Sequence, residues 1–159
     1  MTKAGDLASA IGKGLVAGAA GTVAITASQL LAQRVLGQEE SSAPADAVEK
    51  LIGVEPKDEG AKRRLGMLTH FVYGAGWGIP RALMELFGLR GWSATGVHFG
   101  MVQGAAGAML PALDIGPAPT EIPPKELGIE AVHHAVYAVT TGLVLEAIDR
   151  RSERLRLAA

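Results

Sequence analysis

Histidine is the residue type in this chain that could do the most chemistry, since an imidazole can carry a proton or bind a metal near neutral pH. All four histidines, His70, His98, His133 and His134, lie in stretches that are otherwise uncharged and largely apolar. Ionisable groups inside such stretches are rare, and they are typical of proton relays and of cofactor ligation. The histidines are therefore the first candidates for function.

Glu130 and His133 form a Glu-x-x-His pair, which places a carboxylate and an imidazole on one face of a helix. Di-iron bundles use two such pairs, and this sequence contains no second one. The sequence therefore allows at most a single-metal site, formed by His70, Glu130 and either His133 or His134. These residues are expected at a similar depth, because the two helices that carry them begin on the same side of the bundle. Two histidines on facing helices could also ligate a haem iron. The favoured interpretation is that these histidines are structural, and we therefore expect no cofactor. A bound metal ion and a bound haem are the alternative hypotheses.

Conventional catalytic motifs are missing from the sequence. It contains no P-loop, no dinucleotide fingerprint, no Gly-x-Ser-x-Gly elbow and no His-Glu-x-x-His. The absence of cysteine excludes a thiol nucleophile, a disulfide and a thiolate metal site. We therefore predict no catalytic residue, and an enzyme is the less favoured class.

Four runs without Asp, Glu, Lys or Arg organise the chain: residues 14–33, 65–80, 91–113 and 131–145. The first and third are long enough to span the hydrocarbon core of a bilayer, and the other two need charged residues at their ends to reach the interface. We therefore predict an all-α fold, a single domain over residues 1–159, built as a four-helix transmembrane bundle. The expected spans are about 12–34, 65–88, 91–113 and 127–148.

Small residues recur at four-residue spacing in these runs, which is typical of helices that pack closely in a membrane. The predicted packing positions are Gly14, Gly18, Gly74, Gly78, Gly96, Gly100, Gly104 and Gly142. The same spacing serves contacts between chains, so a homo-oligomer or association with another membrane protein is expected through these faces.

The segment between the first two spans, residues 35–64, is polar and contains 7 acidic and 5 basic residues. Ser42 and Pro44 can start a short helix in it, and Gly53 can end that helix. The last two spans are joined by a proline-rich loop. An even number of spans places both termini on one side, and 8 basic residues there against 7 on the other favour the cytoplasm.

The overall composition limits the remaining classes. Hydrophobic residues make up 48% of the 159 residues, and a formal net charge of −1 gives no electrostatic basis for binding nucleic acid. A soluble bundle rich in Ala and Gly is the alternative fold, because aromatic residues, which mark membrane interfaces, are only 4% of the chain.

Residues 65–151 resemble the YagU-like family of small bacterial inner-membrane proteins. The resemblance rests on Thr69-His70 at a helix start, Glu85 and Trp92 around a short turn, and a Gly/Ala helix that ends at Pro111. A proline-rich loop, a last helix that carries histidine, and the acidic-then-basic ending from Glu146 to Arg151 complete it. The resemblance implies a multi-pass protein of the bacterial inner membrane and no particular reaction.

The expected function is that of an accessory or stress-related membrane protein whose partner is the lipid bilayer. The alternative function is a metal- or haem-binding redox or transport protein of the membrane that uses the helix-borne histidines.

Overall fold

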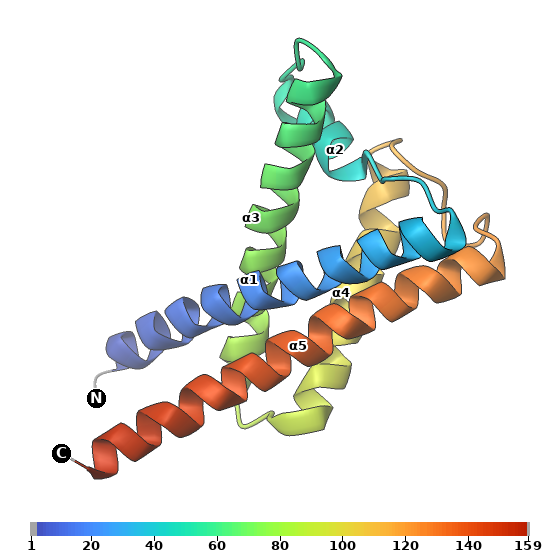
Figure 1. The fold of residues 1–159 in the computed structure, drawn as a ribbon. Coiled ribbons are helices and arrows are strands. Elements are labelled where there is room, and N and C mark those ends of the chain that lie inside the picture. The colour runs from blue at the N-terminus through green and yellow to red at the C-terminus, as the bar shows by residue number, and fades with distance from the viewer. Residues whose placement is uncertain (1–2, 159) are drawn as a thin grey trace.

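The computed structural model describes residues 3–158, apart from the side chain of residue 156, and within them the chain is helical with no strand. The five helices are α1 (Lys3–Leu36), α2 (Ala43–Ile52), α3 (Glu59–Leu86), α4 (Gly91–Ala112) and α5 (Pro124–Leu157) (Figure 1). The all-helical prediction is thus confirmed. The expected spans 12–34 and 127–148 lie within α1 and α5, whereas 65–88 and 91–113 run two residues and one residue past the ends of α3 and α4.

Three of the long helices also extend beyond the expected spans, by nine residues at the start of α1, by nine at the end of α5 and by six at the start of α3. The reason is that Glu, Lys and Arg favour helix about as much as leucine does, so a helix does not stop where hydrophobicity stops. Among the described residues two helices, α1 and α5, are long and apolar enough to cross a membrane. The structure thus supports a helical protein with two helices able to span a membrane in its described residues, and it does not establish four spans.

The polar segment between the first two spans contains α2, as predicted. Gly53 ends α2 in the left-handed conformation, with φ 68° and its N–H bonded to the carbonyl of Glu49. Ser42 stands at the cap position but does not cap the backbone, because its hydroxyl donates to the Asp46 carboxylate at 2.6 Å. The helix is instead held to α3 through Lys62, whose ammonium lies 2.7 Å from Asp46 Oδ1.

The Asp46–Lys62 contact predicts how the docking of α2 depends on pH. Hydrogen bonds from Lys62 and Ser42 hold the pKa of Asp46 below its ordinary value, so docking is favoured while Asp46 is charged. This stabilisation is complete above the ordinary pKa of an aspartate and is lost as the pH falls through the lower folded value. The protection of the α2 amides, which is their exchange rate relative to that of an unstructured peptide at the same pH, should therefore decrease below about pH 4. Asp46→Asn should show the low protection at every pH, and an unchanged pH profile of protection in that variant would contradict the assignment.

The helices form two antiparallel pairs that cross each other. In Figure 1 α1 and α5 run side by side in opposite directions, with both termini at one end, and α3 crosses α1. A short turn with glycines at positive φ, Gly88 at 81° and Gly91 at 59°, reverses the chain between α3 and α4. Besides these crossings, α4 packs against α5 and α2 packs against α3.

The α1–α3 crossing is built from glycines on both helices. A Cβ atom on Gly14 would lie 2.6 Å from the carbonyl oxygen of Gly78, and one on Gly18 would lie 2.5 Å from that of Ala75. Gly74 and Gly78 meet α1 in the same way, Gly74 against the side chain of Thr22. These four glycines let two backbones touch, which is the role that the sequence predicts for them.

The predicted packing face of α4 is wrong for contacts within the chain. A Cβ on Gly96, Gly100 or Gly104 would meet nothing within 4 Å, and all three glycines are exposed. The buried residues of α4 are Ala94, Thr95, His98 and Val102. Gly spacing shows where a close approach is allowed, but here the contacts of His98 and Thr95 set which side of α4 faces the other helices. Gly142 does face inward, toward Thr95 and Arg81.

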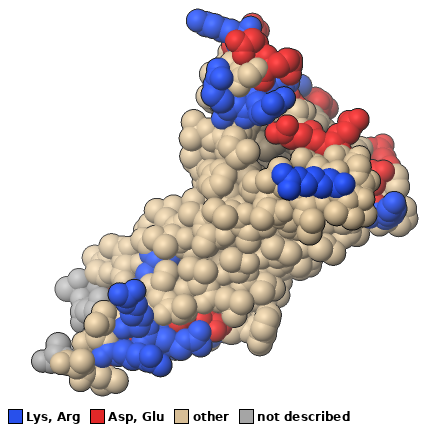
Figure 2. Space-filling model, viewed as in Figure 1, with Lys and Arg blue, Asp and Glu red and all other residues tan. Residues whose placement is uncertain are grey.

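The distribution of polar and apolar side chains is the reverse of that in a water-soluble bundle, with polar groups inside and apolar groups on the surface. Buried side chains include Arg81 and His98, each 0% exposed, whereas Val16, Leu31, Val72 and Val132 are between 58% and 66% exposed. On the face shown in Figure 2, charged residues gather around α2 and the neighbouring loops at one end and near the chain termini at the other. The surface between these ends is almost free of charge (Figure 2).

Candidate functional site

Polar side chains occupy much of the space between the long helices. They come from α1, α3, α4 and α5 and comprise Thr22, Arg81, Thr95, His98, His133 and Thr141, all buried. The purely apolar core is small by comparison, with Ala10, Ala17, Ala82 and Leu145 in one cluster and Ile25, Val102 and Tyr137 in another. Burying a polar group costs free energy unless the group forms a hydrogen bond, so we expect these side chains to have hydrogen-bond partners.

His98 joins three helices near the middle of the molecule. Its Nε2 lies 2.9 Å from the carbonyl oxygen of Trp77 on α3 and donates to it, and its ring packs against the ring of Tyr137 on α5, with centroids 5.5 Å apart. The hydroxyl of Tyr137 donates to the carbonyl of Gly74 on α3 at 2.6 Å. These bonds tie α4 and α5 to the glycine-rich face of α3.

Arg81 lies on the same face of α3, one to two turns beyond Gly74 and Gly78. Its side chain is fully buried, and Nη1 donates to Oε1 of Glu85 at 3.1 Å. An Arg–Glu pair at this spacing is usually a modest interaction on a helix surface, but here α3 turns Arg81 inward, toward Thr95 of α4 and Gly142 of α5. The spacing contained the signal, since residues 74, 78, 81 and 85 follow one another on a single helix face.

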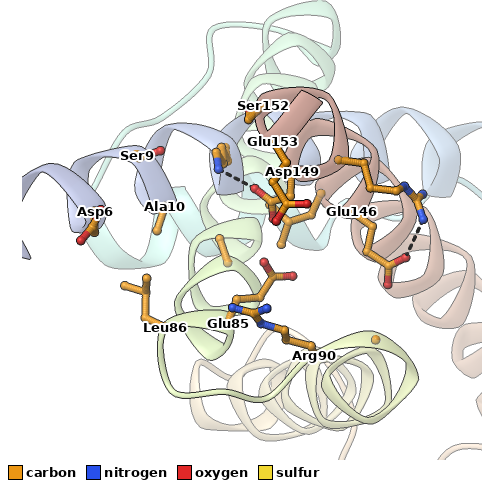
Figure 3. Close-up of a pocket in the computed structure, with 15 residues that line it drawn as sticks. Asp6, Ser9, Ala10, Glu85, Leu86, Arg90, Glu146, Asp149, Ser152 and Glu153 are labelled. Atoms are coloured by element: carbon orange, nitrogen blue, oxygen red, sulfur yellow. Dashed lines mark hydrogen bonds and ion pairs between the residues drawn. The ribbon is translucent and has the colours of Figure 1, made fainter. Parts of the chain in front are cut away.

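A charged cavity of about 530 Å³ opens beside this pair, at the end of the molecule that carries the termini. Its walls come from the first turns of α1, the end of α3, the start of α4 and the last turns of α5. In Figure 3 the carboxylates of Glu85 and Asp149 point toward one another. The ammonium of Lys13, on α1, donates to Oδ1 of Asp149. Arg90 lines the same cavity. The ion pair Lys13–Asp149 thus joins α1 to α5, and the ion pair Arg81–Glu85 lies within α3. Both pairs lie at or beside the wall of this cavity.

The opposite half of the bundle holds the two adjacent histidines of α5, which face different helices. His133, 3% exposed, shares a 2.7 Å hydrogen bond with Ser28 of α1. His134 donates from Nδ1 to the side-chain oxygen of Gln103 on α4 at 2.7 Å. Each histidine therefore joins α5 to one neighbour.

The metal ligands predicted from the sequence do not come together. No three His, Asp or Glu side chains in the described part of the chain form a group that could hold a metal ion. Glu130 is exposed, whereas His133 and His134 are bonded to Ser28 and Gln103. The predicted site from His70, Glu130 and either His133 or His134 is therefore not formed among the described residues, because Glu130 is exposed while His133 and His134 are bonded to side chains of two other helices.

His70 has a partly buried side chain whose Nε2 has no hydrogen-bond partner. It packs edge-on against the ring of Phe71, with centroids 6.1 Å apart.

Ser28 is a residue that the sequence interpretation missed, because its partner His133 is 105 positions away. If this bond holds α1 to α5, Ser28→Ala and His133→Gln will each lower the stability of the bundle by about 1 kcal/mol. The double variant will then cost clearly less than the sum, since the second change removes a bond that is already lost. Unfolding titrations of the four proteins measure the coupling, and additive losses would show that the contact contributes nothing.

Comparison with family models, with curated proteins and with solved structures yields no match to this chain.

Proposed function

We propose that this chain is an integral protein of the bacterial inner membrane, in which α1, α3, α4 and α5 cross the bilayer and both termini lie in the cytoplasm. Its role is that of a small accessory or stress-related membrane protein. The charged cavity at the terminal ends of the helices would face the cytoplasm. The resemblance to the YagU-like family is part of this proposal.

The observation that carries the proposal is the reversed polarity of the bundle. In water, burial of Arg81 and His98 beneath a surface of 58–66% exposed Val and Leu side chains would leave both groups in unfavourable surroundings. In a bilayer the same arrangement is favourable, because lipid covers the apolar side chains and polar groups face the bundle interior. The close glycine contacts of α1 with α3 are also typical of helices that associate in lipid.

Single-cysteine labelling tests this arrangement directly, because the chain has no cysteine of its own. Val16→Cys and Val132→Cys lie at positions 60% and 58% exposed in the structure. If lipid covers these positions, a membrane-impermeant maleimide will leave both unlabelled in intact membranes and will label them after unfolding in detergent. Rapid labelling of both in intact membranes would overturn the proposal.

Three further cysteine positions establish the orientation. Phe87→Cys, 87% exposed in the turn between α3 and α4, should be labelled from the same side as Leu157→Cys, which is 90% exposed near the end of α5. Ser41→Cys, in the connection between α1 and α2, should be labelled from the opposite side. Labelling of Phe87→Cys and Ser41→Cys from one side would contradict the crossing of α3.

The exposed glycine face of α4 extends the proposal to association between chains. At Gly96, Gly100 and Gly104 an added Cβ would meet no described residue within 4 Å, and stripes of small residues allow close helix contact in lipid. A second membrane helix, from another copy or from a partner, would pack there. Disulfide crosslinking of Gly100→Cys in native membranes would detect a second copy, and its absence would leave a different partner to be captured by crosslinking to neighbouring proteins.

A further inference from the structure

Glu85 and Asp149 bring two carboxyl groups from different helices face to face at the wall of the charged cavity. Figure 3 shows these groups pointing toward one another, Glu85 from the end of α3 and Asp149 from the last turns of α5. The two groups lie within hydrogen-bonding reach of each other. Only 17% of the Glu85 side chain and 28% of the Asp149 side chain are exposed, which limits the screening of their charges by water.

Each of these carboxyl groups is bonded to its own cation through one oxygen. Oε1 of Glu85 accepts from Arg81, one turn earlier on α3, and Oδ1 of Asp149 accepts from Lys13 of α1. Among the described residues, neither cation bonds to both carboxyl groups. An ionised carboxylate can only accept hydrogen bonds, so a hydrogen bond between the two groups requires a proton on one of them.

Other charged groups face the pair from the neighbouring segments. The cavity wall also includes Asp6 of α1, Arg90 before α4, and Glu146, Arg150 and Glu153 of α5. Glu146 is paired with Arg150 at 3.8 Å. No histidine is among the described residues that line the cavity, so its carboxyl groups are the groups that can change charge there near neutral pH.

The contact between the two carboxyl groups joins the end of α3 to the last turns of α5. Along the rest of its length α3 packs mainly against α1 and far less against α5. Loss of this one contact can therefore widen the cavity between the ends of α3 and α5 and leave the glycine-rich α1–α3 crossing intact.

We propose that Glu85 and Asp149 share one proton, and that loss of this proton widens the charged cavity by separating the end of α3 from the end of α5. Two carboxyl groups in contact cannot both ionise without bringing two like charges together. The pair therefore carries one negative charge while the contact is closed, and the cavity is narrow at lower pH and wide at higher pH. The proposal does not depend on membrane insertion.

Infrared spectroscopy of the purified full chain in neutral detergent tests the shared proton. At about pH 7, where ordinary carboxyl groups are ionised, we expect the carbonyl band of one protonated carboxyl group. Glu85→Gln and Asp149→Asn should each remove this band, because either change leaves one carboxylate beside its own cation. Glu146→Gln, which alters another carboxylate of the same cavity, is the matched control and should keep the band. Absence of the band from the unaltered chain, or its persistence in both Glu85→Gln and Asp149→Asn, would overturn the proposal.

Spin labels on Phe87→Cys and Leu155→Cys measure the opening, since these positions are 87% and 64% exposed in the turn after α3 and near the end of α5. The distance between the labels should be longer at about pH 9 than at about pH 5, a range in which Lys and Arg stay charged. In Glu85→Gln the distance should stay short at both pH values, because glutamine donates a hydrogen bond to the Asp149 carboxylate as the protonated glutamate does.

The matched control, Glu146→Gln, should show the same pH-dependent distance as the labelled chain without it. A distance that does not change with pH, or an equal change in Glu85→Gln, would overturn the proposal. If Glu85→Gln does not fold, the infrared band of the unaltered chain and its loss in Asp149→Asn decide, because neither measurement requires the Glu85 variant.

Discussion

Replacing Gly18 by alanine will destabilise the bundle by about 1–3 kcal/mol, the usual cost of adding a methyl group to a fully packed interface. The added Cβ would lie 2.5 Å from the carbonyl oxygen of Ala75 and 2.8 Å from that of Gly74. Both atoms belong to the backbone of α3, so no side chain can move aside and the two helices must separate. Unfolding of the purified protein by increasing SDS in a mild detergent, followed by circular dichroism, measures the loss.

The matched control is the same substitution on α4. A Cβ on Gly100 meets nothing within 4 Å, so Gly100→Ala removes only the helix cost of glycine and should be neutral or stabilising by up to about 1 kcal/mol in a monomeric preparation. An equal loss in Gly18→Ala and Gly100→Ala would contradict the assignment of the close crossing to α1 and α3.

Replacing Arg81 by methionine will cost about 3 kcal/mol, at the low end of the range for breaking a buried ion pair because Glu85 keeps 17% of its side chain exposed. The loss arises because the partly buried carboxylate of Glu85, which faces Asp149 at the wall of the charged cavity, then lacks its cation. The same SDS titration measures this effect.

Adding Glu85→Leu to Arg81→Met gives the decisive comparison. The double variant has no unpaired charge at this place, so most of the lost stability should return, as apolar replacements of whole buried ion pairs are often neutral. A double variant that is less stable than Arg81→Met would show that Glu85 stabilises the fold independently of Arg81.

The sequence predicts the helical class and the positions of the long helices because uncharged runs and helix signals are local properties. The short helix α2 and its end at Gly53 follow from the same kind of signal. The α1–α3 crossing is also predictable in part, since Gly14, Gly18, Gly74 and Gly78 have the spacing of close helix contacts.

The partners of the interior polar groups are not predictable in the same way, because they depend on how whole helices are rotated. Gly96, Gly100 and Gly104 have an equally regular spacing, yet α4 turns its opposite side, with His98, to the bundle. His133 bonds to Ser28 of α1 rather than joining Glu130 and His70 in a metal site. A periodic pattern identifies a face of a helix, whereas the neighbour of that face is set by three-dimensional packing.

Extraction of membranes from expressing bacterial cells with alkaline sodium carbonate tests the central claim most directly, since it releases soluble and peripheral proteins and leaves integral ones in the pellet. The account predicts that the full chain stays in the pellet and is released only by detergent. Release of the folded chain into the carbonate supernatant would contradict it, because the exposed Val and Leu side chains of α1, α3 and α5 would then face water or another soluble protein rather than lipid.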